Sequence, residues 1–302
     1  MLSGRMLGRS CLIVGGTSGI GLATAKRFLH EGARVVVTGL HTESTHEALP
    51  VLQELGSVWT LPLDVSDPEA VDNTFQVALR LLGDRLDVVF HVAGQSGRRW
   101  GDGSLDACTL AAWDGVLDAN ARGTFLTNQA AVRRMLEQPR DEHGLRGTIL
   151  NLGSVIDQSP SPDYFGTIAY AASKGAVRAL TRAAAARYAR DGIRFNLLVP
   201  GLIDTPMAQR AVNDPTIRSY LTTKQALTGH PGTSADCAEA ALYLCEPASR
   251  FVTGAELVVD GGWRLSEGQF VPPVGASQIA DEAASAIGSE TAPPALEAPP
   301  ES

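Results

Sequence analysis

Short apolar runs alternate with longer segments of helical periodicity along most of this chain. The runs are rich in Val, Ile and Leu and do not alternate strictly with polar residues, which is typical of strands buried on both faces of a parallel sheet. They predict strands at residues 11–15, 34–38, 58–63, 86–93, 148–152, 193–199 and 256–259.

The segments between these runs carry the helical pattern. They predict helices at residues 19–30, 68–82, 110–137, 168–190 and 234–246. Asp67 before Pro68 is a favourable helix start, and Ser234 is a candidate N-cap. Repeated strand–helix–strand units predict an α/β fold, a Rossmann-like, doubly wound parallel sheet of about seven strands with helices on both faces. Ligands bind such sheets at the carboxyl ends of the strands.

Charge divides the chain into two parts. The 302 residues include 25 Lys and Arg against 33 Asp and Glu, a net charge of −8, which argues against a general nucleic-acid binder. Residues 267–302 hold six acids and no Lys or Arg, so residues 1–266 keep a net charge of only −2. We therefore expect one domain over residues 1–266.

The acidic segment has the composition of a tail. It contains six of the 17 prolines and a single aromatic residue, Phe270. Such a segment cannot bury much apolar surface, so we expect residues 267–302 to be a disordered Pro/Ala/Glu-rich extension.

Cysteine usage and hydropathy indicate a compartment. The four cysteines show no CxxC or Cys/His spacing, which predicts reduced thiols and no metal site. No apolar run reaches the ~20 residues of a membrane span, and the N-terminus lacks the apolar core of a signal peptide. We expect a cytoplasmic protein with no membrane partner.

A glycine-rich turn follows the first predicted strand. Gly15, Gly19 and Gly21, with Thr17, Ser18 and Ile20 between them, open the next helix. Glycines there let the backbone approach a pyrophosphate, and the helix N-terminus offers free N–H groups to the anion. A plain glycine turn is the alternative, but the place between strand and helix favours a dinucleotide site.

The second strand ends where the cofactor is usually selected. An acid at this point would bind the adenosine ribose and repel a 2′-phosphate. The strand ends Thr38-Gly39-Leu40-His41, with neither an acid nor an arginine, so the sequence favours NADP, with Thr38, His41 or Thr42 as phosphate contacts. Asp64 and Val65 after the third strand suit the adenine ring, although turn capping explains Asp64 equally well.

Tyr170 and Lys174 form the candidate acid–base pair. Their i, i+4 spacing places both on one helix face. Free tyrosine has a pKa of ~10, and a nearby cation favours the phenolate, bringing that pKa toward the working range. Ser154 ends the fifth strand, and Asn120 is an unusual polar residue inside a predicted helix. The rival Tyr164 lacks a lysine four residues on.

Together these motifs resemble the classical short-chain dehydrogenase/reductase (SDR) family over about residues 8–266. The resemblance also includes the Ala93-Gly94 turn, the segment from Pro200-Gly201 through Ile203 to Thr205, and the Asp260-Gly261-Gly262 segment. It implies a Rossmann fold, an NAD(P) cofactor, hydride exchange between an alcohol and a ketone, and a homodimer or homotetramer.

The resemblance also implies residue roles. Tyr170 would be the acid/base, Lys174 would hold the ribose and lower the pKa of Tyr170, and Ser154 would orient the substrate oxygen. Asn120 would hold a water in the proton relay. The implied cofactor contacts are Gly15, Thr17, Ser18, Gly19, Ile20, Gly21, Thr38, Asp64, Val65, Ala93, Gly94, Asn120, Tyr170, Lys174, Pro200, Gly201, Ile203 and Thr205.

Three departures from the family pattern stand out. Val14 replaces the usual Thr, and His91-Val92 replaces the usual Asn-Asn. The gap of 16 residues between Ser154 and Tyr170 exceeds the family's usual gap. None of these departures removes a catalytic group.

Two alternative functions stay open. A 3-oxoacyl-(acyl-carrier) reductase would need a basic docking face, for which Arg98, Arg99, Arg133 and Arg134 are candidates. A catalytically silent nucleotide-binding interaction protein on the same fold is the other. We interpret the loop of Arg98 and Arg99 as solvated, with one salt bridge to Asp102 or Asp106. The resemblance implies a substrate lid over residues 204–230, whose mixed apolar residues ordinary helix packing explains equally well.

The tail prediction can be tested by truncation. Because the predicted site residues all precede residue 206, deleting residues 268–302 is expected to leave kcat and KM of the enzyme intact. Steady-state kinetics of the truncated and full chains check this. A large loss of activity would show that the tail contributes to the site or to assembly.

Overall fold

A seven-stranded parallel sheet forms the centre of the protein in a computed structural model, which describes residues 4–268. The strand order is β3-β2-β1-β4-β5-β6-β9. The strands are β1 (Ser10–Val14), β2 (Arg34–Gly39), β3 (Val58–Pro62), β4 (Val88–His91), β5 (Gly147–Leu152), β6 (Ile193–Pro200) and β9 (Glu256–Val259). The predicted fold class and all seven predicted strands are confirmed, with ends that differ by at most two residues.

The register aligns the carboxyl ends of the central strands. Val14 of β1 lies opposite Thr38 of β2 on one side and His91 of β4 on the other. The chain therefore leaves β1 and β4 next to each other, on the two sides of the point where the strand order reverses. Such a switch point opens a crevice at the carboxyl edge of the sheet.

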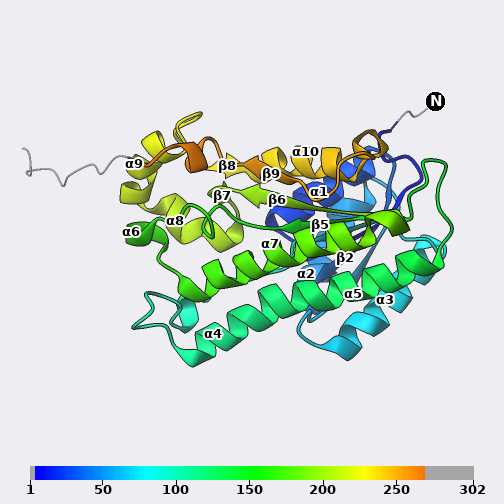
Figure 1. Ribbon diagram of the computed structural model, residues 1–302, viewed down its shortest axis with the longest axis horizontal. Coiled ribbons are helices and arrows are strands. Elements are labelled where there is room, and N and C mark those ends of the chain that lie inside the picture. Colours follow the sequence, from blue (N-terminus) through cyan, green and yellow to red (C-terminus); the bar gives the residue numbers. More distant parts are fainter. Residues whose placement is uncertain (1–3, 269–302) are drawn as a thin grey trace, which may run out of the picture. The chain divides into compact units, whose positions relative to one another are not determined.

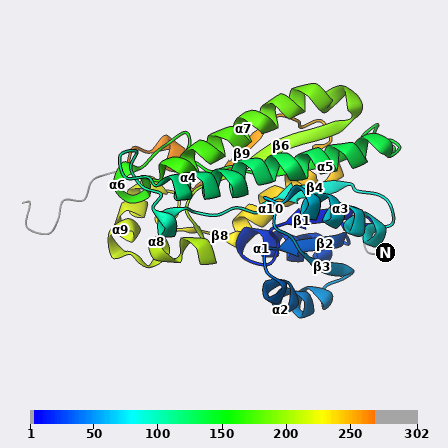
Figure 2. The ribbon, with the colours of Figure 1, turned by 90° about the horizontal axis from the view of Figure 1, so that it is seen from below.

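Helices cover both faces of the sheet (Figure 2). On one face lie α1 (Gly19–His30), α2 (Thr42–Gln53) and α10 (Ser234–Cys245), which contribute Phe28, Leu52 and Leu242 to a buried cluster. On the other face lie α3 (Pro68–Leu82), α5 (Gly123–Glu137) and α7 (Ile168–Tyr188), with Phe75, Met135 and Ala185 in a second cluster. Burial of these two apolar layers provides the main driving force for the fold.

Smaller elements gather beside the carboxyl ends of the strands. They are α6 (Pro162–Phe165), α8 (Gln209–Asn213), α9 (Pro215–Lys224) and the short strands β7 (Ile203–Asp204) and β8 (Gly232–Thr233). Figure 1 shows α6, α8 and α9 together at one end of the domain. They pack over a third apolar cluster around Trp263, Leu221 and Val155, so the predicted lid segment has its own small core.

Three sequence-based predictions need correction. The helix expected at 110–137 is divided into α4 (Leu110–Leu117) and α5 by a π turn at Asp118–Arg122. Helix α2 was not predicted, because its polar composition and internal Pro50 hide the periodicity. The N-cap of α10 is Thr233 rather than Ser234, in a reciprocal capping box with Asp236.

His91 shows how the central strands are tied to the helices. Its Nδ1 lies 2.8 Å from the Thr127 hydroxyl of α5, and burial lowers the pKa of His91 to about 3. On the neighbouring strand, Asn151 exchanges two amide hydrogen bonds with Asn128 of α5. The polar contacts at these positions therefore join sheet to helix.

The predicted tail lies, beyond Gly268, outside the described residues. Over residues 4–268, no helix has the length and apolar character required to span a bilayer.

Candidate active site

A pocket of about 660 Å³ opens along the carboxyl edge of the sheet. It runs from the turn after β1, past the ends of β2, β3 and β4, to the first turns of α7 and the segment after β6. Every residue to which the family resemblance assigns catalysis or cofactor contact lines it, except Asn120. The fold thus brings the motif residues, which are spread between positions 15 and 205 of the sequence, into one pocket.

The turn from Gly15 to Gly21 forms a concave backbone surface, called here the glycine cradle, which side chains at the glycine positions would fill. Gly15 has φ +88°, and a Cβ there would lie 2.6 Å from the Ala93 nitrogen. A Cβ on Gly21 would lie 2.2 Å from the Gly15 oxygen. Both contacts are shorter than real atoms allow, so this close packing of α1 on the turn requires glycine.

The start of α1 borders this cradle and has no side-chain cap. The N-cap residue Ser18 makes no side-chain cap, so its hydroxyl does not satisfy the first amides of the helix. Ser18, Gly19 and Ile20 line the pocket. Free amides at a helix N-terminus beside a glycine cradle fit the pyrophosphate of a dinucleotide.

The far end of the pocket is lined by Thr38, Gly39 and Leu40 after β2, and by Asp64 and Val65 after β3. The Thr38 hydroxyl accepts a hydrogen bond from the Gly15 amide at 3.3 Å. Asp64 Oδ1 accepts from both the amide and the hydroxyl of Ser66, at 2.9 and 2.7 Å. Asp64 therefore caps its own turn, as one interpretation expected, and it also lines the pocket, where its contact with an adenine ring stays a prediction.

His41 and Thr42 do not line the pocket, unlike Thr38. They form the N-cap and first residue of α2. Of the three residues considered as phosphate contacts, only Thr38 lies in the cavity wall.

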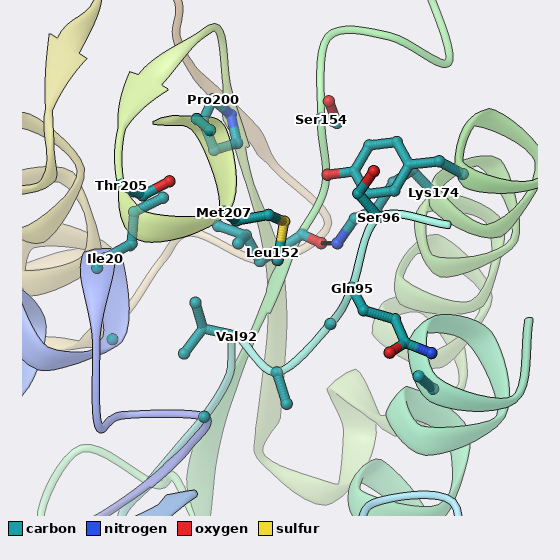
Figure 3. Close-up of a pocket in the computed structure, with 18 of the residues that line it drawn as sticks. Ile20, Val92, Gln95, Ser96, Leu152, Ser154, Lys174, Pro200, Thr205 and Met207 are labelled. Carbon is teal, nitrogen blue, oxygen red and sulfur yellow. Dashed lines mark hydrogen bonds between the residues drawn. The ribbon is translucent and has the colours of Figure 1, made fainter. Parts of the chain in front are cut away.

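Tyr170, Lys174 and Ser154 lie together on the opposite wall. Figure 3 shows Ser154 and Lys174 across the pocket from Ile20 and Thr205. Lys174 Nζ lies 5.6 Å from the centre of the Tyr170 ring and donates a 2.9 Å hydrogen bond to the Leu152 carbonyl. The Tyr170 hydroxyl is hydrogen-bonded to Ser154. A tyrosine, a serine and a lysine ammonium thus surround one point of the cavity.

Burial acts on both titratable groups of this cluster. It raises the pKa of Tyr170 to about 12, although the hydrogen bond with Ser154 acts in the opposite direction. It lowers the pKa of Lys174 to about 8, with the nearby Asp157 carboxylate opposing the shift. The lowered tyrosine pKa that the resemblance implied is absent from the protein alone, because desolvation of the phenolate is the largest effect.

Asn120 lies behind the pocket wall, in the π turn. Its Nδ2 donates to the Gln95 carbonyl and to Ser173, both at 3.0 Å, and its Oδ1 accepts from the Gln95 amide at 2.8 Å. Both amide hydrogens are therefore used to clamp the loop after β4 against α7. The implied role of Asn120 in holding a water stays a prediction.

The loop of Arg98 and Arg99 differs from its sequence-based interpretation. Neither arginine forms a salt bridge within the described residues. Arg99 instead stacks over the Trp100 ring, 4.1 Å from its centre. The buried Asp102 accepts from the backbone amides of Ala169 and Tyr170, each at 3.0 Å, so it caps α7 from a distant part of the chain.

Arg178 is a site-supporting residue that the sequence analysis missed. It lies one helical turn beyond Lys174 and binds Asp157 in a bidentate manner, at 2.6 and 2.8 Å, and also pairs with Glu256. Because Asp157 follows Ser154 by three residues, this contact fixes the Ser154 loop against α7. No sequence motif predicts the contact between Arg178 and Asp157, because the two residues are 21 positions apart.

Residues 14–264 match the family model described as Enoyl-(Acyl carrier protein) reductase. The chain belongs to the short-chain dehydrogenase/reductase family.

Named relatives of this SDR protein are dehydrogenases. It is 30% identical over 265 residues to 2,5-dichloro-2,5-cyclohexadiene-1,4-diol dehydrogenase LinX of Sphingobium indicum, covering 87% of this chain and 99% of the relative. It is 34% identical to 2-(R)-hydroxypropyl-CoM dehydrogenase of Xanthobacter autotrophicus, covering 85% and 99%. The structure of a short-chain type dehydrogenase/reductase from Mycobacterium ulcerans matches with a TM-score of 0.79 at 26% identity, covering 90% and 95%. The family and these relatives support an oxidoreductase activity on alcohols.

The buried ammonium of Lys174 predicts an opposition between stability and function. Lowering the pKa of a lysine from 10.5 to about 8 means that the charged form destabilises the fold by about 3 kcal/mol. Lys174→Met is therefore expected to raise the free energy of unfolding at pH 7 while activity falls. The gain in stability is reduced by the contribution of the lost hydrogen bond to Leu152. Urea denaturation and kinetics of the same samples measure both.

The direction of the Lys174 pKa shift predicts how stability changes with pH. Between pH 8 and 10.5 the folded protein has released the Lys174 proton while the unfolded chain still binds one, so wild type gains stability as pH rises. The excess of the free energy of unfolding of Lys174→Met over that of wild type should be largest below pH 8 and should shrink toward pH 10.5. A stability difference that is constant with pH would contradict this account. Lys26→Met on α1 is the control for loss of a lysine elsewhere.

Proposed function

We propose that this SDR protein is an NAD(P)-dependent oxidoreductase that transfers a hydride between the nicotinamide and an alcohol or ketone. One observation carries the proposal: the Tyr170 hydroxyl, bonded to Ser154 and beside the buried Lys174, lies in the same cavity as the glycine cradle. One pocket therefore holds both the proposed groups for proton transfer and the proposed dinucleotide cradle.

Tyr170 is the proposed acid/base of the reaction. In reduction its hydroxyl gives a proton to the carbonyl oxygen, and in oxidation the phenolate takes the proton of the alcohol. A bound nicotinamide would supply or accept the hydride. With its pKa raised to about 12, Tyr170 is protonated at neutral pH, which suits reduction. Oxidation requires positive charge nearby to favour the phenolate, and Lys174 supplies it below pH 8.

The other proposed roles follow from position. Ser154 orients the substrate oxygen toward Tyr170, and the resemblance assigns the ribose to Lys174. Gly15 to Gly21 would hold the pyrophosphate at the start of α1. Val65, Ala93, Gly94, Pro200, Gly201, Ile203 and Thr205 line the cavity between these groups and are the remaining proposed contacts.

NADP is the proposed cofactor form. The wall after β2 consists of Thr38, Gly39 and Leu40 and contains no carboxylate that would bind the ribose and repel a 2′-phosphate. A side chain at Gly39 would meet Thr17 and Ser44 at 2.6 to 2.9 Å. An acid at position 39 would therefore require movement of the cradle.

Assembly and location extend the proposal beyond the pocket. A homodimer or homotetramer is proposed, because α4 and α5 carry the exposed apolar side chains Leu110 and Phe125. A cytoplasmic location is proposed from the cysteine usage of the sequence. The silent-protein alternative is disfavoured by the complete set of Asn120, Ser154, Tyr170 and Lys174.

Removing one oxygen atom tests the proposed acid/base. Tyr170→Phe is expected to lower kcat by about 10²–10⁴-fold, because proton transfer is lost, while NADPH still binds. Turnover of a ketone panel and cofactor fluorescence titration measure the two effects. Tyr188→Phe removes the same atom at the far end of α7 and is the control. Equal activity of wild type and Tyr170→Phe on every substrate would refute the assignment.

A charge placed after β2 tests the cofactor preference. Wild type is expected to bind NADPH more tightly than NADH. Leu40→Asp should lower the NADPH preference by about tenfold or more, because a carboxylate repels the 2′-phosphate. Leu40→Asn has the same shape without the charge and is the control. Tighter binding of NADH by wild type would overturn the NADP proposal.

A further inference from the structure

Two arginines converge at the substrate end of the pocket. Arg98 Nη2 donates to the Tyr164 carbonyl at 2.7 Å, and Arg210 Nη2 donates to the same oxygen at 3.4 Å. Both side chains line the cavity. Tyr164 belongs to α6, just before the helix that carries Tyr170, so the shared acceptor of the pair is on the segment that leads into α7.

No carboxylate neutralises this pair. Neither Arg98 nor Arg210 has an acidic group within salt-bridge distance among residues 4–268. The pKa of Arg98 is lowered, first by burial and then by the charge of Arg210. Asp102 acts in the opposite direction on Arg98, but its oxygens accept the amides of Ala169 and Tyr170. The two guanidinium groups, on residues exposed at the mouth of the cavity, therefore repel each other with only partial compensation from Asp102 and the Tyr164 carbonyl.

The Arg98 side of this pair is held in place relative to Tyr170. Arg98 opens the short 3₁₀ turn η1 (Arg98–Trp100), in a loop anchored at its start by the bonds between Gln95 and Asn120. The end of the loop is anchored by Asp102, and by the Gly103 carbonyl, which accepts from the Ile168 amide at 3.1 Å. Both anchors bind α7 or its contacts, so Arg98 keeps a fixed relation to the proposed acid/base.

The Arg210 side comes from a different part of the fold. Arg210 lies on α8, five residues after Thr205 at the cofactor end of the segment that follows β6. The same cavity is also lined by the apolar side chains of Ile156, Phe165 and Met207. A molecule in this part of the pocket would meet Ser154 and Tyr170 at one end, an apolar wall, and two guanidinium groups at the other.

We propose that Arg98 and Arg210 form a subsite for an anionic group of the substrate. The substrate class is a secondary hydroxy acid or the matching keto acid, with its carboxylate between the two guanidinium groups and its carbinol at Tyr170. Guanidinium groups bind carboxylates through paired, charge-assisted hydrogen bonds. This inference rests on the proposed oxidoreductase function and specifies the substrate of the same site.

Paired substrates test the subsite. Short secondary hydroxy acids are each compared with their primary amides, which keep the shape and remove the charge. Wild type is expected to favour the acid in kcat/KM by about tenfold or more. In the double variant Arg98→Gln/Arg210→Gln this acid-to-amide ratio should fall by about tenfold or more, mainly through KM for the acid.

Arg99→Gln is the matched control. It removes the same charge from the neighbouring position, but Arg99 stacks on Trp100 and does not line the pocket. The acid-to-amide ratio should stay at the wild-type value. An equal fall in Arg99→Gln and in the double variant would mean general electrostatic steering and would overturn the subsite.

A binding measurement separates this inference from the proposed function. The hydroxy acid should raise the Tm of wild type and not that of the double variant, whether or not turnover occurs. Turnover of neutral alcohols with no preference for the acid would overturn the subsite and leave the oxidoreductase function intact. A rise in Tm for wild type alone, with no turnover of any alcohol, would support the subsite and refute the proposed function.

Discussion

The arrangement of the pocket depends on where the first turns of α7 lie against the end of β5. Three separate contacts fix this position. Asp102 accepts the amides of Ala169 and Tyr170, Lys174 donates to the Leu152 carbonyl, and Arg178 holds Asp157 in the loop after Ser154. One contact comes from the loop after β4 and two come from the end of β5 and the loop that follows it, so α7 cannot shift without breaking at least one of them.

This placement has a free-energy cost that points to function. A buried lysine and a half-buried tyrosine are desolvated, so the charged form of each is disfavoured. A fold selected for stability alone would place apolar side chains at both positions. Two shifted titratable groups facing one cavity are instead typical of a site for proton transfer.

The two ends of the pocket are built in different ways. The proposed cofactor end is formed by strand ends and by glycines whose close packing leaves no room for a side chain, so its shape is set by the sheet itself. The substrate end is formed by the loop after β4, by α6 and by α8, which are not part of the sheet. This division lets one family keep a common dinucleotide site while loops determine the substrate.

The sequence by itself determined the sheet, the glycine turn and the Tyr170–Lys174 pair. These depend on local periodicity or on residues four apart, and local spacing is readable along a chain. It missed α2, because polar residues and Pro50 disguise the helix, and it did not show the π turn that sets Asn120 behind the wall. Only the tertiary structure decided that Asp102 caps α7 rather than pairing with an arginine, and that Arg98 and Arg210 meet at Tyr164. Such partners are 46 to 68 residues apart, and which distant groups meet depends on how the layers pack, not on any repeat in the sequence.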